Sequence, residues 1–162
     1  MTKLKVFFIF FLSFMSLQAF AAMTSEQITA KEKGIILYNQ YKTTLAIPYL
    51  LAASEAGDSE SQYYLGEALR KKNRHMTSEA QRWYEAAAEK GNLYAMIQLG
   101  RIGNDICKTM ENCPATKKNP AEWLIEATNL AKPKAEQGDA EAMYIMYELS
   151  LDRAWLEKSA NA

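Results

Sequence analysis

Apolar and polar positions along this 162-residue chain recur with a fixed period. Residues 49–58 (YLLAASEAGD) return 34 positions later as residues 83–92 (WYEAAAEKGN), and residues 61–66 (SQYYLG) return as 95–100 (AMIQLG). A period of this length is typical of stacked helical hairpins, because one hairpin alone cannot bury its apolar face. The pattern therefore predicts an all-α fold, an array of stacked helical hairpins.

The repeat also places the helix ends. Glycine recurs where one helix is expected to stop, and an Asp or Asn follows it at once, in the pairs Gly57-Asp58, Gly91-Asn92 and Gly138-Asp139. Glycine suits the left-handed position that ends a helix, and Asp or Asn accepts hydrogen bonds from the free N–H groups that open the next one. We expect helices over residues 25–41, 45–56, 59–72, 79–90, 93–103, 120–137, 140–151 and 153–161.

Other helix starts carry caps of their own. Thr24 is expected to open the first helix, and Ser78 with Gln81 has the form of a capping box. Asn119 precedes a proline at the first helical position and a Glu at the third, again a cap pattern. Pro133 is expected to kink or break its helix near residues 130–132.

Small and large apolar residues predict how the hairpins pack. Large side chains at Tyr49 and Trp83 are expected to fill the core between layers. Small residues on the same helices let neighbouring helices approach, and further apolar residues follow at i+4 on the partner helices. The small positions are Ala52, Ala53, Ala86 and Ala87, the matching partner positions are Ser61, Ala95 and Ala142, and the i+4 positions are Leu65, Leu99 and Met146.

The first 22 residues have the form of a secretory leader. Lys3 and Lys5 precede an apolar run over residues 6–17, and small residues follow at the spacing that signal peptidase reads. The run is shorter than the roughly 20 residues that a spanning helix needs, although a retained N-terminal anchor is the alternative. We expect a periplasmic or secreted protein with no integral membrane segment after cleavage.

Removing the leader leaves 17 basic and 19 acidic residues. This balance lacks the basic stripe of a nucleic-acid-binding protein, so no nucleic acid is expected as a partner. The cysteines, Cys107 and Cys113, both lie in the stretch 104–119 that interrupts the repeat. In an exported chain such a pair favours a disulfide, worth about 2–3 kcal/mol for a short loop. A metal clip is the alternative, but the only histidine, His75, lies in another unit.

The repeated residues resemble the Sel-like repeat family, which is related to the tetratricopeptide repeat. The shared pattern is A-x-x-Y/W-x-x-x-A, then G-D/N, then A-x-x-x-L-G, and it is clear over residues 46–100 and looser over 121–162. The resemblance implies a right-handed α-solenoid that binds partners on its concave face. It divides residues 23–162 into units of about 43–76, 77–119 and 120–151, and an incomplete unit 152–162.

Candidate chemistry is sparse in the chain. His75 lies in a polar turn, and after the leader no Ser-x-x-Lys, Gly-x-Ser-x-Gly or phosphate-cradling glycine loop occurs. Carboxylates gather at the hinges, where an Asp caps a helix and nothing apolar would raise its pKa for acid–base work. The sequence therefore predicts no enzyme activity, no metal and no cofactor.

Binding to another protein is the remaining class of function. Residues beside the packing positions are expected to face the groove or solvent, in the equivalent sets Tyr64, Gln98 and Ile145, and Glu67, Arg101 and Glu148. Such a mixed ridge suits a protein partner, and the alternative is that it only covers the surface between helices.

Some small exported members of the resembled family look like immunity proteins for phospholipases injected by type VI secretion. We therefore expect an inhibitor that neutralises a secreted lipase. Other exported members are linked to β-lactam binding or hydrolysis, which is one alternative. A truncated remnant is another, because the residues from Trp155 look like the start of a further helix whose hinge glycine would fall just beyond Ala162.

Overall fold

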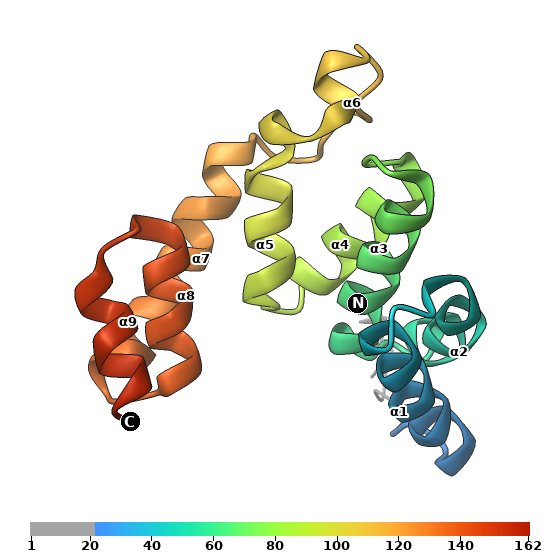
Figure 1. Ribbon diagram of the computed structural model, residues 1–162, viewed down its shortest axis with the longest axis horizontal. Helices are drawn as coiled ribbons and strands as arrows, with labels where there is room; N and C mark the ends of the chain where they lie inside the picture. Colours follow the sequence, from blue (N-terminus) through green and yellow to red (C-terminus); the bar gives the residue numbers. More distant parts are fainter. Residues whose placement is uncertain (1–21) are drawn as a thin grey trace, which may run out of the picture.

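The computed structural model describes residues 22–162, so the predicted leader lies outside the described residues apart from its last position. The described part is all-helical and contains no strand (Figure 1). Its helices are α1 (Ser25–Asn39), α2 (Thr43–Glu55), α3 (Ser59–Asn73), α4 (Ser78–Ala88), α5 (Leu93–Gly100), α6 (Ile106–Thr109), α7 (Pro120–Glu136), α8 (Ala140–Ser150) and α9 (Arg153–Ala160), with a 3₁₀ turn η1 (Ile102–Asn104) after α5.

Helices that follow one another along the chain pack against one another. Contacts run in order from α1 to α5, then from α5 to α7, α8 and α9. Two further contacts skip a neighbour, α1 with α3 and α5 with α8. Figure 1 shows α1 and α2 at one end, α8 and α9 at the other, and α6 standing away from the rest at one edge.

The predicted helix positions are confirmed, with shifts of a few residues at the ends. The exception is α6, which was not predicted and lies inside the cysteine-bearing stretch. The three hinges are also confirmed. Gly57, Gly91 and Gly138 have φ of 90°, 85° and 96°, and the following Asp58, Asn92 and Asp139 each accept a hydrogen bond from the backbone N–H three residues on.

Two of the other predictions about helix ends need correction. The cap of α4 is Thr77, whose side chain accepts from the backbone N–H of Ala80, and not Ser78. A break near residues 130–132 is wrong, because α7 continues through Pro133 to Glu136. The caps at Thr24 and Asn119 are confirmed, and both are complete capping boxes.

The core lies one residue further along α2 and α4 than predicted. Tyr49 and Trp83 are only half-buried, whereas the next residues, Leu50 and Tyr84, are wholly buried. Successive residues of an α-helix are rotated by about 100° about its axis, so a shift of one position replaces a side chain that faces the core with one that lies at the side of the helix. For the same reason Ala52 is exposed and Ala86 half-buried, while Ala53 and Ala87 are buried. The predicted positions on α3, α5 and α8 are all buried: Ser61, Ala95, Ala142, Leu65, Leu99 and Met146.

The Leu-Gly pair that ends two of the repeated segments has a packing function. A Cβ added at Gly66 would lie 3.0 Å from the ring of Tyr84, and one at Gly100 would lie 2.3 Å from Cδ2 of Leu124. The next helix therefore approaches the backbone at these positions as closely as glycine allows. Within residues 22–162 no helix is long and apolar enough to cross a membrane.

Candidate functional site

The largest concavity that we find crosses four helices of the described part. It encloses about 660 Å³, and its lining is dominated by tyrosine, with two carboxylates and two amides. α1, α3, α5 and α8, together with the cap that opens α5, supply the lining. The lining residues are Tyr38, Asn39, Glu60, Tyr63, Tyr64, Asn92, Tyr94 and Glu141, and we call this site the tyrosine groove.

The tyrosine rings form a continuous row from α1 to α5. Centroids lie 5.2 Å apart for Tyr38 and Tyr64, 5.3 Å for Tyr63 and Tyr64, and 5.7 Å for Tyr63 and Tyr94. The first two pairs meet edge to face, an arrangement that aromatic quadrupoles favour. The row therefore holds the rings in fixed positions and presents a broad aromatic surface.

A buried carboxylate lies beneath this row. Glu67 on α3 accepts a hydrogen bond from Tyr38 Oη of α1 at 2.9 Å and another from Tyr84 Oη of α4 at 2.8 Å. The Glu67 side chain is 8% exposed, and Tyr84 is wholly buried. One side chain thus joins three helices at the base of the groove.

The pKa values of the phenols in the groove are raised above the ordinary value of tyrosine. Burial raises the pKa of Tyr63, and the charge of Glu67 raises it further. Burial, followed by the charge and hydrogen bond of Glu141, raises the pKa of Tyr94 to about 12. At neutral pH these side chains present O–H groups and aromatic faces, while the negative charge comes from the carboxylates beside them.

Two lysines of the chain itself lie at the edge of the groove. Lys31 Nζ is 2.8 Å from Glu60 Oε2 and 2.9 Å from Asp58 Oδ2. Lys71 Nζ lies 4.0 Å above the ring of Tyr38. The aromatic and acidic groups of this surface therefore already hold cations on the α1 side.

The six residues predicted to bind a partner do not lie together on one surface of the structure. Tyr64 lines the groove and Glu67 forms its base, but Glu67 is buried and does not face solvent as predicted. Gln98 and Arg101 line a smaller neighbouring cavity of about 140 Å³, and Arg101 Nη1 pairs with Glu148 Oε2 at 2.9 Å.

The prediction for Ile145 is also wrong. Its side chain is completely buried, so it faces neither the groove nor solvent. The physical reason is that α8 packs against α5, α7 and α9, and Ile145 lies on the part of α8 that these contacts cover. Ile145 therefore belongs to a core cluster that includes Ile97 and Met146.

Several groove residues were missed by the sequence prediction, although the repeat carried a signal for them. Glu60, Tyr94 and Glu141 each stand two residues after a helix cap, at the same place in three successive units. That position in the first turn points into the groove each time. Tyr63 was missed because it is the immediate neighbour of Tyr64 and its equivalent, Ile97, is a core residue.

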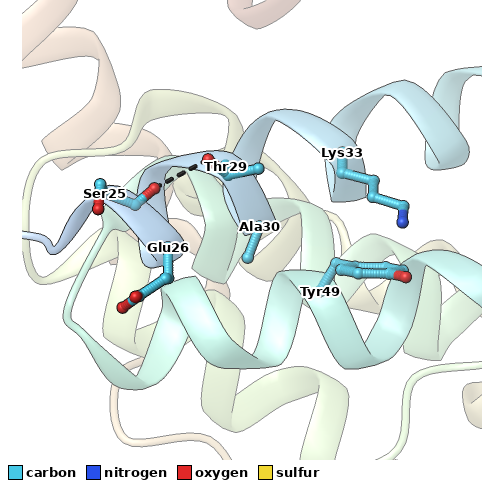
Figure 2. Close-up of a pocket in the computed structure, with 6 residues that line it drawn as sticks. All are labelled: Ser25, Glu26, Thr29, Ala30, Lys33 and Tyr49. Atoms are coloured by element: carbon cyan, nitrogen blue, oxygen red, sulfur yellow. Dashed lines mark hydrogen bonds between the residues drawn. The ribbon is translucent and has the colours of Figure 1, made fainter.

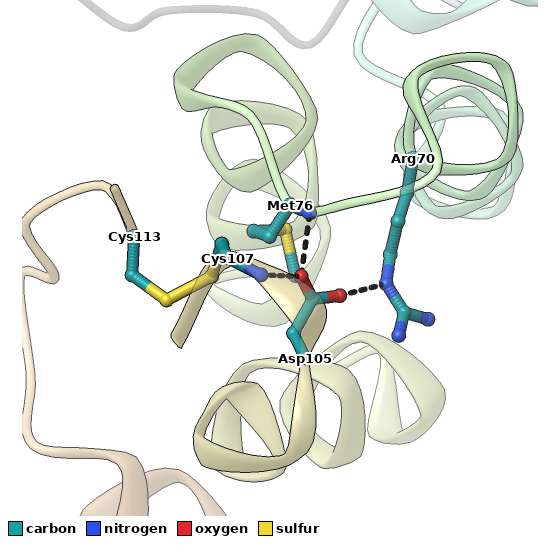
Figure 3. The surroundings of a disulfide bond; sticks show 5 residues. All are labelled: Arg70, Met76, Asp105, Cys107 and Cys113. Atoms are coloured by element: carbon teal, nitrogen blue, oxygen red, sulfur yellow. Dashed lines mark hydrogen bonds and ion pairs between the residues drawn. A yellow bond between two sulfur atoms is a disulfide. The ribbon is translucent and has the colours of Figure 1, made fainter. Parts of the chain in front are cut away.

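The cysteines form the predicted disulfide, between Cys107 and Cys113 (Figure 3). The bond joins Cys107, the second residue of α6, to Cys113 in the segment that follows the helix. Because both sulfur atoms are bonded to each other, the alternative of a metal clip is not realised at this pair. Cys107 is buried in the main core cluster, which fixes the loop to the body of the protein.

Asp105 anchors the same loop to α3. Its Oδ1 accepts from the backbone N–H groups of Met76 and Cys107, both at 2.9 Å, and its Oδ2 accepts from Arg70 Nε at 2.7 Å (Figure 3). Burial alone would raise the pKa of Asp105, but these hydrogen bonds outweigh it and hold the pKa below its usual value. Arg70 also donates to Gln98, so the anchor extends to α5.

A further concavity of about 330 Å³ lies between α1 and α2 (Figure 2). Its polar groups are largely engaged locally: Thr29 donates to the backbone carbonyl of Ser25 at 2.9 Å, and Lys33 lies over the ring of Tyr49 at 4.3 Å. Figure 2 shows the ring of Tyr49 beneath the side chain of Lys33. This site lacks the converging carboxylates and rings of the tyrosine groove.

Another group of titratable side chains lies around Glu85, whose carboxylate accepts from Gln81 Nε2 and from the backbone N–H of Lys117, so the chain itself already occupies it. Residues 22–162 contain no group of three or more His, Cys, Asp or Glu side chains placed to hold a metal ion. His75 is half-buried in the turn after α3, with Nδ1 2.8 Å from the carbonyl oxygen of Asn73. The tyrosine groove is therefore the best-formed candidate site.

Comparison with known proteins adds no family assignment. No protein-family model matches the chain, and a search of curated proteins finds no significant match. The resemblance to Sel-like repeats rests on the motif in the sequence and stays a prediction.

Proposed function

We propose that this chain is a protein-binding helical-repeat module and that the tyrosine groove is its contact surface. The observation that carries the proposal is the groove itself: Tyr38, Tyr63, Tyr64 and Tyr94 converge from three separate helices on one concavity. Tyrosine supplies a large contact area at a small cost in side-chain entropy, and it is enriched among residues that dominate binding energy.

The arrangement of the hairpins supports the same proposal. α1 contacts α3, the rings of Tyr63 and Tyr94 join α3 to α5, and α5 contacts α8. In a right-handed α-solenoid one helix of each successive hairpin lines the inner side, and we propose that α3, α5 and α8, the second helices of the three units, do so here together with α1. An extended inner surface of this kind suits a partner with a protruding segment.

We further propose that the chain acts outside the cytoplasm as an inhibitor of a secreted lipase. The leader pattern over residues 1–22 supports export, and the Sel-like motif supports the immunity role. A lipase that attacks the inner membrane from outside would have to be blocked in the periplasm. Inhibition by binding requires a fitted surface and no catalytic group, which the groove provides.

The lipase proposal predicts protection of cells. Cells that export a lipase encoded beside this gene are expected to grow when the chain is co-expressed with its leader, and the two proteins are expected to co-purify. Tyr64→Ala is expected to weaken co-purification at least about tenfold, because it removes a central ring of the groove. Ile125→Ala, on the exposed surface of α7, is the matched control and is expected to behave as the wild type.

Normal killing of cells that contain the exported chain at wild-type level would contradict the inhibitor role. Equal loss of co-purification in Tyr64→Ala and Ile125→Ala would contradict the groove as the contact surface.

A further inference from the structure

We infer that the tyrosine groove recognises a cationic side chain, lysine or arginine, on a protruding segment of its protein partner. This inference rests on the proposed function and specifies the chemistry of the partner. Its centre is the part of the groove formed by Tyr63, Tyr64, Tyr94 and Glu141.

The first observation in favour of a cationic ligand is the charge of the residues that line the groove. Glu60 and Glu141 line the groove, and none of the described residues that line it is a lysine or arginine. Asn39 and Asn92 supply the other polar groups, which are uncharged. A concavity that combines carboxylates with aromatic faces is complementary to a cation, through ion pairing and through the negative face of each ring.

Two lysines of the chain itself provide the second observation, because their ammonium groups already bind to a ring and a carboxylate of the groove. Lys71 lies over the Tyr38 ring and Lys31 pairs with Glu60, both on the α1 side. On the α5 and α8 side, by contrast, no cation of the described part lies over Tyr63, Tyr64 or Tyr94. Glu141 has no ion pair within residues 22–162, and the contact that we find for its carboxylate is with the hydroxyl of Tyr94.

The third observation is that two tyrosine hydroxyl groups of the groove are free to accept hydrogen bonds. No residue of the described part hydrogen-bonds to Oη of Tyr63 or Tyr64. Both remain able to accept from the N–H groups of a guanidinium or ammonium, and burial raises the pKa of both phenols further above physiological pH. Arginine fits this set best, since its planar group stacks on rings while its N–H groups reach a carboxylate.

The size of the groove favours a chain segment over a lone ion. Its volume of about 660 Å³ accommodates more than one side chain, and α3 continues from it toward Arg70 and Gln98 in the neighbouring cavity. A partner segment can therefore place a cationic residue against Glu141 while its flanking residues lie along α3.

Matched peptides test the inference with the full chain, expressed with its own leader and purified. The probe is a fluorescent acetyl-Ala-Arg-Ala-Ala-Arg-Ala amide, and the control peptide carries citrulline, the neutral isostere of arginine, at both arginine positions. We expect anisotropy titrations to give a Kd at least about tenfold lower for the arginine peptide, and to weaken as salt is raised.

Variants connect that difference to the groove. Glu141→Gln keeps an acceptor for Tyr94 but removes the charge, and it is expected to raise the Kd of the arginine peptide about tenfold. Glu79→Gln, which removes the same charge from the exposed first turn of α4, is expected to leave it unchanged. The inference is overturned if the arginine peptide does not bind, if the citrulline peptide binds equally well, or if Glu141→Gln matches the wild type.

The same variants separate this inference from the proposed function. If Tyr64→Ala loses the protein partner while Glu141→Gln retains it at wild-type affinity, the cationic inference fails and the groove still binds a protein. If neither variant affects partner binding, both proposals fail. If both variants lose the partner and the arginine peptide competes with it, both are supported.

Discussion

Replacing Asp105 with alanine is expected to lower the free energy of unfolding by about 3 kcal/mol, because it leaves buried hydrogen-bond donors without an acceptor. The side chain of Asp105 is only 3% exposed, and it receives the backbone N–H groups of Met76 and Cys107 as well as Arg70 Nε. Arg70 is one-third exposed and can turn to water, so most of the loss comes from the N–H groups. Urea unfolding followed by tryptophan fluorescence measures the change.

Two further variants show whether this loss has the proposed origin. Asp105→Asn retains one oxygen for the N–H groups and loses the ion pair, so we expect about half the effect. Asp152→Ala removes an Asp cap from the exposed start of α9 and is expected to cost about 1 kcal/mol. A loss in Asp105→Ala no larger than that of Asp152→Ala would show that the anchor contributes only as an ordinary cap.

The Asp105 anchor also predicts a pH dependence. Because its pKa is lower in the folded chain than in the unfolded one, the anchor contributes fully above the unfolded pKa of about 4. The contribution is lost as the pH falls through the folded pKa. The stability difference between the wild type and Asp105→Asn is therefore expected to be constant near neutral pH and to shrink below about pH 4.

Glu67→Ala is the second substitution with a large expected effect, about 3 kcal/mol. It leaves the hydroxyls of Tyr38 and Tyr84 without their acceptor and creates a hole between α1, α3 and α4. Because Tyr38 lines the tyrosine groove, we expect partner binding to weaken as well. Chemical unfolding measures the first effect and titration with the arginine peptide the second.

Conservative variants isolate the role of the two hydrogen bonds. Glu67→Gln keeps the side-chain volume and one acceptor, and Tyr84→Phe removes one donor, so each is expected to cost about 1 kcal/mol. If Glu67→Gln were as damaging as Glu67→Ala, packing and hydrogen bonding would not explain the loss, and the negative charge itself would have to be essential.

The sequence was most informative where structure depends on local chemistry. The hinge at Gly91 and Asn92 could be placed to the residue, because a left-handed glycine and a side-chain cap act within a few positions of the chain. α6 was missed because a helix of four residues at the start of a disulfide loop is too short to carry a periodic pattern.

The faces of the helices were harder to predict. Whether Trp83 or Tyr84 enters the core depends on how α4 is rotated against α3, and the glycine at Gly66 settles this by letting the Tyr84 ring lie against the backbone. Ile145 was expected to face the groove or solvent by repeat equivalence alone. Its burial follows from the contacts of α8 with α5, α7 and α9, which no single repeat unit encodes.

The tyrosine groove could be predicted only in part. Tyr64 was identified because it is offset by one position from a packing residue, whereas the groove as a whole appears only when α1, α3, α5 and α8 are brought together. Glu67 shows the limit of the argument from equivalence. It shares a repeat position with Arg101 and Glu148, which pair at the surface, yet the tyrosines of the neighbouring helices turn it into a buried acceptor.

Site-specific photocrosslinking tests the central claim, that the tyrosine groove binds a protein partner, most directly. Benzoylphenylalanine is placed at Tyr64 in the groove or at Ile125, which is 60% exposed on α7, in the full chain in living cells. We predict that illumination joins one partner protein to position 64 and none to position 125. An adduct at position 125 alone, equal adducts at both positions, or none at position 64 would contradict the claim.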